Sequence, residues 1–452
     1  MFKKLDEYKN NVAIIEDKDY SYNEILFFSK ELTSHISKRD LVIHLTSNTF
    51  ESIAGYVGFI KEKIVDLLLP SDINKILLKD VIQNYKPKFL YIPISLKDEF
   101  EFKEVVRYKN YCLLKTNFDI DYKINDELAL LLTTSGSTGS LKFVRQSYKN
   151  IYSNAKSIIK YLNIKSDDIA ITTLPSSYTF MLSIINSHFL QGGSIVTCEY
   201  SIMQKEFWDL IKEKKVTTFS GVPFTFEMLK RLRFDRMDLE SIKYITQAGG
   251  KLREDLVEYF INSCEKKDIK FIVMYGQTEA TARISYLPWK NRDKIGSIGI
   301  AIPDVKIELA NDGELICKGD NVTLGYSQNC YDLYKGDENK GILYTGDIAK
   351  QDKDGFFYIV GRKKRFVKIF GNRVNLDELE KIANKNGYEV VIGGNDEKIV
   401  IYSTKEYKDI IEFLSKIIKQ NKKVFKLKII DSIIRNSSGK VLYKEMEKQY
   451  GY

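Results

Sequence analysis

The sequence predicts an α/β protein of at least two domains, and three observations lead to this prediction. The chain has 452 residues, which is more than one hydrophobic core ordinarily serves. From Asn11 to about residue 120, short apolar segments alternate with amphipathic ones, a pattern typical of parallel βαβ units. From about residue 365 to the end, one helical segment and several strand-like segments predict a small α+β domain.

The individual elements follow from local patterns. In the first part of the chain, strands are predicted at 12–16, 41–45, 128–132, 169–174, 216–219, 244–247 and 271–274, and helices at 21–37, 50–61 and 148–162. Ser21 suits the N-cap of the first helix because Glu24 stands at the third helical position, where it completes a capping box. In the last part, a helix is predicted at 376–386 and strands at 389–392, 399–402 and 425–430. The segment Gly313–Tyr326 is also predicted to be rich in β-strands.

Composition narrows the class of protein. An apolar fraction of 44% with 29% charged residues is typical of a soluble globular protein. The net charge of +9, from 70 Lys and Arg against 61 Asp and Glu, is spread along the chain. We interpret it as Lys-rich solvated surface that attracts acidic ligands, because no concentrated patch or nucleic-acid motif accompanies it.

The cysteines, the histidines and the apolar segments indicate which disulfides, metal sites and membrane spans to expect. The five cysteines stand singly, and the three histidines are far apart in sequence. Neither a disulfide framework nor a structural zinc site is therefore predicted. No apolar run approaches the ~20 residues that span a bilayer, and the N-terminus lacks the apolar core of a secretion signal. We therefore expect no membrane span and a cytoplasmic location.

The segment from Leu131 to Lys142 has the chemistry of a phosphate-binding loop. After an apolar strand it brings together hydroxyls, glycines and a lysine: Thr134, Ser135, Gly136, Ser137, Thr138, Gly139 and Lys142. Glycine lets backbone N–H groups approach an anion, while hydroxyls and an ammonium group add donors and charge. On general grounds such a run is more often a plain turn. The Walker spacing is absent, since the lysine follows the last glycine by three positions.

This segment resembles the signature loop of the AMP-forming adenylation superfamily, which includes acyl-CoA synthetases, peptide-synthetase adenylation domains and luciferases. The family pattern is Thr-Ser-Gly-Ser/Thr-Thr-Gly-x-Pro-Lys, and the chain departs from it at Leu141, where the family usually has proline. Proline would stiffen the loop without adding a phosphate ligand. Further motifs follow in the family's order, so the resemblance extends over essentially the whole chain. It implies binding of ATP and Mg²⁺.

The hexapeptide Tyr275–Ala280 resembles the family's Tyr-Gly-x-Thr-Glu motif. The resemblance implies that this motif, with Gly276 and Gln277, binds the nucleotide: Tyr275 gives an aromatic face to the adenine, Thr278 bonds the α-phosphate, and Glu279 holds Mg²⁺. A carboxylate oxygen is the kind of ligand that Mg²⁺ prefers. The pair Gly249 and Gly250 resembles the family's adenine-pocket loop, although taken alone it reads as a turn.

Tyr178 and Thr179 correspond to the positions that shape the acid pocket in this family. In members that activate α-amino acids, an aspartate commonly stands at the second position and pairs with the ammonium group. Because burying an ammonium group without a carboxylate is unfavourable, Thr179 indicates a substrate without an α-amine. In the alternative interpretation, Thr179 only packs and another acidic residue pairs with the amine.

Four charged residues complete the predicted site. By the same resemblance, Asp347 accepts hydrogen bonds from the ribose hydroxyls and Arg362 contacts the ribose or phosphate. Lys364 is the hinge residue, which divides the chain into an ATP- and acid-binding adenylation domain, 1–363, and a small C-terminal domain, 364–452, that rotates about the hinge. Lys368 follows the hinge and is expected to serve thioester formation. As part of a charge run it could instead be a solvated surface residue.

Lys440 ends the segment Asn436–Lys440, which corresponds to the family's terminal catalytic motif. Together with Lys142 and Mg²⁺ on Glu279, it would neutralise charge as a carboxylate attacks the α-phosphate of ATP, while Thr278 would supply a hydrogen bond. The expected reaction gives an acyl-adenylate, which is then captured by CoA or by the phosphopantetheine of an acidic acyl carrier protein. A non-catalytic nucleotide-binding relative and an amino-acid-activating enzyme are the alternatives. The identity of the small carboxylic acid stays open.

Overall fold

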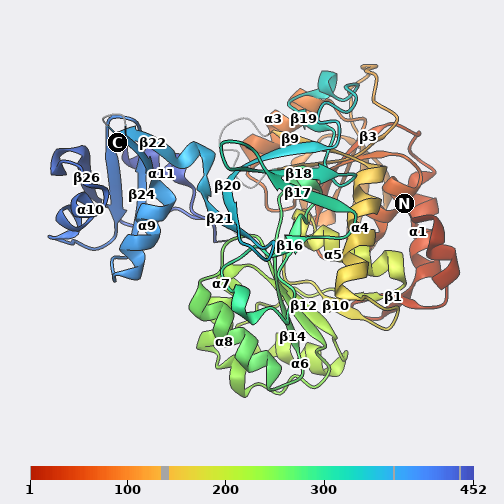
Figure 1. The fold of residues 1–452 in the computed structure, drawn as a ribbon. Coiled ribbons are helices and arrows are strands. Elements are labelled where there is room, and N and C mark those ends of the chain that lie inside the picture. Colours follow the sequence, from red (N-terminus) through yellow and green to blue (C-terminus); the bar gives the residue numbers. More distant parts are fainter. Residues whose placement is uncertain (1, 134–141, 370–371, 437–438, 452) are drawn as a thin grey trace. The chain divides into compact units, whose positions relative to one another are not determined.

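The computed structural model describes residues 2–133, 142–369, 372–436 and 439–451, and the chain divides into two compact units (Figure 1). Unit 1 comprises Met1–Lys306 and Cys317–Leu343, and unit 2 comprises Ile307–Ile316 and Tyr344–Tyr452. Within the described ranges, none of the helices has the length and apolar character that crossing a bilayer requires.

A nine-stranded sheet forms one half of unit 1. Its strands lie in the order β16 (Ile300–Ala301), β15 (Ser285–Tyr286), β14 (Lys270–Tyr275), β13 (Tyr244–Gln247), β12 (Thr218–Gly221), β10 (Ile169–Ile171), β11 (Ser194–Val196), β1 (Val12–Ile15) and β2 (Asp19–Ser21). The strands from β14 to β1 pair in parallel, while β2, β15 and β16 are antiparallel. The loops after β13 and β14, which carry the predicted nucleotide motifs, therefore leave the same edge of the sheet.

An eight-stranded sheet forms the other half. Its order is β19 (Gly325–Ser327), β9 (Phe143–Ser147), β8 (Leu128–Thr133), β4 (Val65–Pro70), β3 (Leu41–Thr46), β5 (Phe89–Pro93), β7 (Tyr111–Lys115) and β6 (Lys103–Arg107). The strands β8, β4, β3 and β5 are parallel, and β9 turns back antiparallel to β8. The predicted βα alternation to residue 120 is wrong after β5, because β7 and β6 follow as antiparallel strands with only a 3₁₀ turn between β5 and β6.

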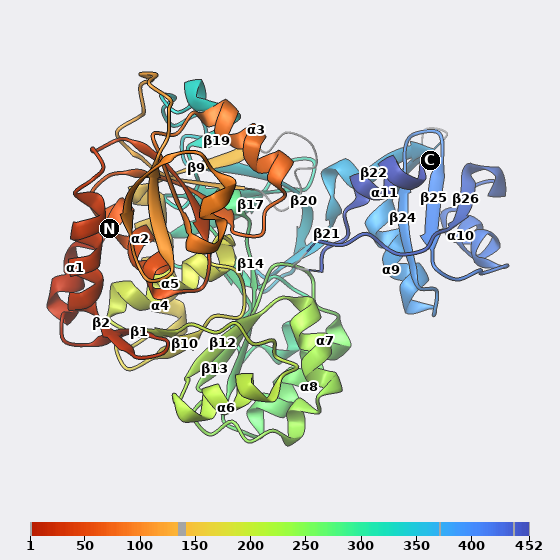
Figure 2. The same ribbon diagram turned by 180° about the vertical axis from the view of Figure 1, so that it is seen from behind.

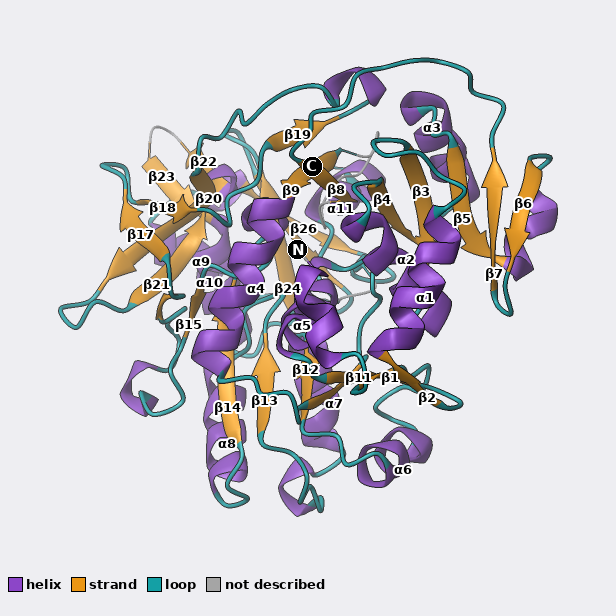
Figure 3. Cartoon of the chain, turned by 90° about the vertical axis from the view of Figure 1, so that its right-hand side faces the viewer, coloured by secondary structure: helices purple, strands orange, loops and turns teal. Residues whose placement is uncertain are grey.

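Helices fill the space between these sheets and cover their outer faces. The helices of unit 1 are α1 (Tyr22–Thr33), α2 (Phe50–Lys61), α3 (Lys75–Tyr85), α4 (Tyr148–Leu162), α5 (Thr179–Gln191), α6 (Lys205–Glu213), α7 (Pro223–Arg231) and α8 (Glu254–Glu265). Apolar side chains of α1, α2, α4 and α5 share one core with strands of both sheets, and Figure 3 shows α4 and α5 between them. A second core lies under α6, α7 and α8 on the far face of the nine-stranded sheet (Figure 2). The third lies under α3.

Unit 2 contains a β-rich part and the α+β part. The four-stranded sheet has the order β17 (Val305–Leu309), β18 (Glu314–Gly319), β20 (Ile342–Gln351) and β21 (Phe357–Arg362). Residues 305–306, 317–319 and 342–343 of these strands are assigned to unit 1. The hairpin β22 (Phe366–Ile369) and β23 (Asn372–Asn375) follows, and then a sheet of β24 (Val390–Gly394), β25 (Ile399–Ser403) and β26 (Phe425–Ile429). The helices are α9 (Leu376–Lys385), α10 (Ile410–Ile418) and α11 (Tyr443–Tyr450).

Short 3₁₀ helices connect many of these elements. They are η1 (Phe2–Tyr8), η2 (Ile94–Glu99), η3 (Phe234–Arg236), η4 (Thr278–Ala280), η5 (Arg292–Lys294), η6 (Cys330–Asp332), η7 (Lys363–Arg365) and η8 (Lys422–Val424).

Several local predictions are confirmed, while the ends of several helices and strands differ, including β12, which covers Thr218–Gly221 and not 216–219. The Ser21 capping box forms as expected, with the backbone N–H of Ser21 donating to Glu24 at 2.7 Å. Helix α1 ends at Thr33 and not at residue 37, and β10 ends at Ile171 and not at residue 174. The β10 strand ends early because the chain must become irregular before Pro175, which has no N–H to continue a ladder. The five cysteines are free and buried.

Candidate functional site

The Tyr275–Ala280 motif lies in a tight loop between β14 and β15. The loop closes where Tyr275 pairs with Ser285 across the two antiparallel strands. A Cβ atom on Gly276 would lie 1.7 Å from the carbonyl oxygen of Ala282, so only glycine lets the two sides of the loop approach each other. This close backbone contact explains why the motif has glycine at position 276. Thr278 and Glu279 follow in the short helix η4.

Thr278 lies against the start of helix α5. Its Oγ1 is 3.0 Å from the Oγ1 of Thr179, which is the first residue of α5 and is buried. The carbonyl of Thr278 accepts a hydrogen bond from the side chain of Gln146 on β9 at 3.3 Å. The residue predicted to bind phosphate and one predicted to shape the acid pocket are thus in direct contact.

Gly249 and Gly250 lie close to Tyr178, which directly precedes Thr179 in the chain. Gly249 has φ +84°, a conformation that favours glycine, and a Cβ there would lie 2.9 Å from the hydroxyl oxygen of Tyr178. A Cβ on Gly250 would meet Pro223 at 3.1 Å. The two glycines therefore let the end of β13 approach the side chain of Tyr178 and the start of α7.

Glu279 and Lys142 are linked through Tyr326. The hydroxyl of Tyr326 donates to Oε1 of Glu279 at 2.9 Å, and the ammonium nitrogen of Lys142 lies 3.4 Å from the centre of the Tyr326 ring. Burial and the neighbouring Glu279 charge raise the pKa of Tyr326, which keeps its hydroxyl protonated as a donor. The carbonyl of Glu279 accepts from the backbone and hydroxyl of Thr323. Sequence reasoning assigned no role to Tyr326, because only the fold brings it to Glu279.

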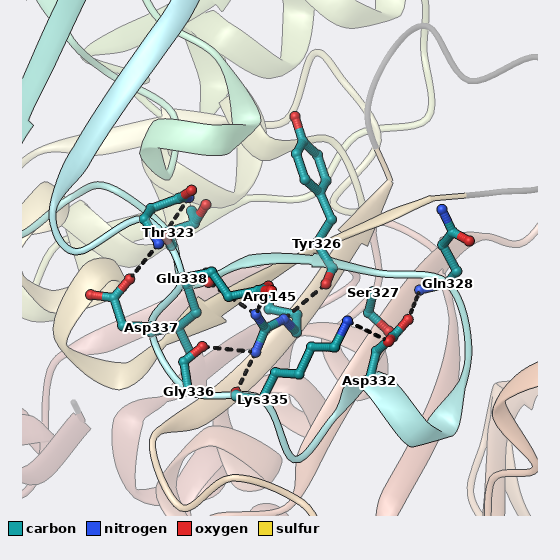
Figure 4. A network of polar contacts seen from close by, with 12 residues as sticks. Arg145, Thr323, Tyr326, Ser327, Gln328, Asp332, Lys335, Gly336, Asp337 and Glu338 are labelled. Carbon is teal, nitrogen blue, oxygen red and sulfur yellow. Dashed lines mark hydrogen bonds and ion pairs between the residues drawn. The ribbon is translucent and has the colours of Figure 1, made fainter.

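The backbone of Tyr326 is in turn held by Arg145, a fully buried residue of β9 (Figure 4). Its Nε donates to the Tyr326 carbonyl at 3.0 Å. The two terminal nitrogens donate to the carbonyls of Leu324, Lys335 and Gly336 and to the carboxylate of Glu338. Arg145 therefore fixes the 324–338 segment from which Tyr326 reaches Glu279.

The side chains around Glu279 fit a magnesium polyphosphate. Glu279 offers hard carboxylate oxygens, Thr278 a hydroxyl, and Lys142 a positive charge. Three or more His, Cys, Asp or Glu side chains do not come together as a metal-binding group in the described part of the chain. One carboxylate with phosphate and water oxygens nevertheless suits Mg²⁺, which usually takes one or two protein carboxylates.

Two of the predicted nucleotide-binding residues, Asp347 and Arg362, lie next to each other in unit 2. They face each other across β20 and β21, and the Nε of Arg362 lies 3.1 Å from Oδ1 of the buried Asp347. Lys440 stands in a turn in which its backbone N–H bonds the side chain of Asn436 at 2.9 Å.

Other predicted residues lie partly or wholly outside what the structure describes. The backbone of Lys364 lies in η7 and that of Lys368 in β22, while their side chains are outside the description. The loop residues Thr134, Ser135, Gly136, Ser137, Thr138 and Gly139 fall wholly outside the described residues.

The fold and these contacts define an α/β protein with a candidate site for a phosphate-bearing ligand. More specifically, the chain belongs to the AMP-binding enzyme family, whose model matches residues 2–327. A 2-succinylbenzoate–CoA ligase of Listeria monocytogenes serotype 4b (strain F2365) is 25% identical over 408 residues, which cover 86% of this chain and 84% of the relative. A probable CoA ligase of Humulus lupulus is 26% identical over 366 residues, which cover 73% of this chain and 65% of the relative. The predicted superfamily and the class of AMP-forming acid–thiol ligases are confirmed.

Solved structures share the fold. The o-succinylbenzoate coenzyme A synthetase MenE of Bacillus subtilis, in complex with ATP and magnesium ion, superposes with a TM-score of 0.78 at 22% identity and covers 98% of both chains. ATP-bound MatB of Rhodopseudomonas palustris gives a TM-score of 0.81 at 21% identity, covering 100% of this chain and 98% of that one. The predicted α/β fold with an α+β C-terminal part is confirmed.

Proposed function

We propose that this chain activates a small carboxylic acid with Mg-ATP and then transfers the acyl group to the thiol of CoA. In the first step, a carboxylate oxygen of the acid bonds to the α-phosphorus and the bond to pyrophosphate breaks. In the second, the thiol sulfur bonds to the acyl carbon, AMP leaves, and the thiol proton passes to solvent. The observation that carries this proposal is the 3.0 Å contact between Thr278 and Thr179, which joins the phosphate motif to the acid pocket.

The residues around Thr278 provide positioning and charge for the first step. Thr278 would donate to the α-phosphate, and Lys142 with the 134–139 loop would neutralise the other phosphates. Glu279 would hold Mg²⁺, which supplies positive charge to the phosphate oxygens when bound. Tyr326 would orient Glu279 through the 2.9 Å hydrogen bond to Oε1.

The remaining predicted residues have roles in holding the nucleotide. Tyr275, Gly276 and Gln277, with Gly249 and Gly250, would border the adenine. Asp347 and Arg362 would bind the ribose, and their 3.1 Å ion pair supports this assignment because it orients the carboxylate.

The C-terminal part would serve the two steps in turn. We propose that 364–452 rotates about Lys364, so that Lys440 reaches the phosphates in the first step and Lys368 the acyl carbon in the second. In this scheme Thr179, which offers no charge to an ammonium group, disfavours α-amino acids.

The acceptor and the location are further parts of the proposal. CoA is preferred because the relatives named above are CoA ligases. The phosphopantetheine of an acidic carrier protein is the alternative, which the net charge of +9 would attract. We also propose a cytoplasmic location, since five free, buried cysteines suit a reducing compartment.

Pyrophosphate exchange with a panel of carboxylic acids tests the proposed function. The panel includes aliphatic and aromatic acids, the corresponding α-amino acids, and 2-succinylbenzoate, and the thioester is then sought with CoA and with a carrier protein. We expect exchange with at least one acid that lacks an α-amine, and thioester formation with CoA. The absence of exchange with every acid would contradict the proposal.

A single substitution separates the two steps. Lys440→Ala is expected to slow adenylation at least ~100-fold while leaving thioester formation from supplied acyl-adenylate nearly unchanged. The matched control is Lys444→Ala, which removes an exposed lysine from the next helix. Equal loss in both steps would refute the two positions proposed for the C-terminal part.

A further inference from the structure

Arg283 is a fully buried arginine whose charge meets no carboxylate among the described residues. It is 1% exposed, and no carboxylate within the described ranges forms an ion pair with it. Its Nε and Nη2 both donate to the single hydroxyl of Ser183, at 3.2 and 3.0 Å, and Nη1 contacts the sulfur of Met274. The guanidinium carbon lies 4.3 Å from the centre of the Phe180 ring. The hydroxyl of Tyr161 is a further polar neighbour of the guanidinium. Two hydroxyls, a thioether and an aromatic face are weak partners for a buried cation.

The nearest ionisable groups do not supply the missing negative charge. Burial lowers the pKa of Arg283, and the hydroxyls of Tyr161, Tyr178 and Tyr244 act against this shift. Burial in turn raises the pKa of all three tyrosines, that of Tyr161 to about 12, so they stay neutral at ordinary pH. The guanidinium itself stays protonated. The site therefore carries a net positive charge.

This charge lies beside the proposed acid pocket. Thr179 and Ser183 are four residues apart on α5, so they share one face of the helix. Thr179 contacts Thr278 on that face, and Ser183 contacts Arg283. The two contacts are about 6 Å apart along the helix axis, a separation that a chain of a few carbon atoms spans.

The backbone directly before Arg283 is strained. Thr281 has φ +61° and Ala282 has φ +133°, values in the region where residues other than glycine are rare. Such strain persists only where the surrounding structure enforces it, and it gathers at functional sites. Here the Gly276 contact with Ala282 and the hydrogen bonds from Asn154 and Asn321 to the carbonyl of Arg283 hold the strained segment.

We infer that Arg283 forms a subsite for a second anionic group of the acid, so that the substrate is a short dicarboxylic acid. The inference rests on the proposed function, since it assigns the reacting carboxylate to the Thr278 side of the pocket. A second carboxylate would replace the weak contacts of the guanidinium by a charge-assisted pair, which arginine forms in a planar, two-bond geometry. A monocarboxylic acid of equal length would leave the buried cation without an anionic partner.

The test compares dicarboxylic acids of three to six carbons with monocarboxylic acids and monomethyl esters of the same chain length. It uses the full-length wild type, Arg283→Met, which removes the charge at similar volume, and Arg283→Lys, which keeps the charge. Pyrophosphate exchange gives kcat and KM for each acid. The thermal unfolding midpoint with and without each acid gives binding independently of catalysis.

In the wild type we expect one of the dicarboxylic acids to exceed its monocarboxylic counterpart at least ~100-fold in kcat/KM. Arg283→Met should lose this preference mainly through KM, and Arg283→Lys should recover part of it. The same dicarboxylic acid should raise the unfolding midpoint of the wild type and leave that of Arg283→Met unchanged. A purely structural role predicts no preference between the two series.

The inference is overturned if the wild type shows no preference for a dicarboxylic acid, or if Arg283→Met keeps that preference. Exchange with monocarboxylic acids alone would leave the proposed function standing and remove the subsite. If no acid supports exchange, the proposed function fails, and the unfolding midpoints then decide the subsite. A rise with dicarboxylic acids that requires Arg283 supports it, and no rise overturns it.

Discussion

Unit 1 contains two fully buried arginines whose surroundings are opposite. Arg145 donates to four backbone carbonyls and to the carboxylate of Glu338, so each of its donors has a strong acceptor. Arg283 has the hydroxyls of Ser183 and Tyr161, one thioether and the face of one ring. Both are at most 1% exposed.

The difference separates a structural role from a binding role. A buried charge that is fully hydrogen-bonded holds its neighbours in place, and Arg145 does this for the backbone of Tyr326. A buried charge with weak partners lowers stability, and a protein retains it where function uses it. Two equally buried arginines therefore have different roles. Arg145 holds the 324–338 segment, and Arg283, we propose, binds the acid substrate.

The largest effect is expected for Arg145→Met. The substitution removes the donors to the carbonyls of Leu324, Tyr326, Lys335 and Gly336, which should lower the free energy of unfolding by about 3–5 kcal/mol. Both tryptophans, Trp208 and Trp289, lie in unit 1, so their fluorescence in urea reports the unit that contains the arginine. A loss below about 1 kcal/mol would mean that the network in Figure 4 contributes little.

The next effect is expected for Tyr326→Phe, which tests what Arg145 positions. Phenylalanine keeps the ring beneath Lys142 and removes only the hydroxyl that donates to Glu279. If Glu279 holds Mg²⁺ as proposed, the Mg²⁺ concentration for half-maximal activity should rise about 10-fold, while KM for ATP at saturating Mg²⁺ changes little. Tyr331→Phe, at an exposed tyrosine of the same segment, is the control. An unchanged Mg²⁺ dependence would separate Tyr326 from the metal.

The comparison also indicates what the sequence can predict. The helices at 50–61 and 148–162 and the strand at 244–247 form at the predicted residues, because periodicity and caps are local properties. The antiparallel β6 and β7 were predicted as part of a βα alternation, since strand pairing partners are not encoded locally. Family resemblance then supplied the motif residues of the site.

Neither Tyr326 nor Arg283 was singled out from the sequence. Tyr326 stands 47 positions after Glu279, and only the β19–β9 pairing brings its hydroxyl to that carboxylate. Arg283 does carry a local signal, because it is a single charge among the mostly apolar residues Ala280–Leu287. Its meaning depends on long-range facts that the sequence does not contain: the burial of its guanidinium and the acceptors around it.

In the absence of ligand, Arg283→Met is expected to change the free energy of unfolding by less than Arg145→Met and in the opposite direction. Ser183 still donates to the carbonyl of Phe180 at 2.6 Å, and the sulfur of Met274 still accepts from Tyr161 at 3.0 Å, so the substitution leaves neither group without a partner. Removing the unpaired buried charge should therefore raise the free energy of unfolding by about 1–2 kcal/mol. The measurement is the urea unfolding described for Arg145→Met. A loss as large as that of Arg145→Met would show that Arg283 is structural after all.

The smallest change in the free energy of unfolding is expected for Glu338→Gln. This substitution tests whether the Glu338 carboxylate or the backbone carbonyls stabilise the buried charge of Arg145. The side chain of Glu338 is 51% exposed, so water screens its attraction to Arg145, and glutamine still offers an oxygen acceptor of the same shape. We expect a loss of less than about 1 kcal/mol, which shrinks further at high salt.

The control for this substitution is Glu258→Gln, which removes an exposed carboxylate on α8. Unfolding of both variants is followed by tryptophan fluorescence at low and high salt. If Glu338→Gln costs as much as Arg145→Met, the counter-ion and not the set of carbonyls stabilises a buried arginine in this protein. Arg283, which has neither among the described residues, would then depend on an anionic ligand even more strongly.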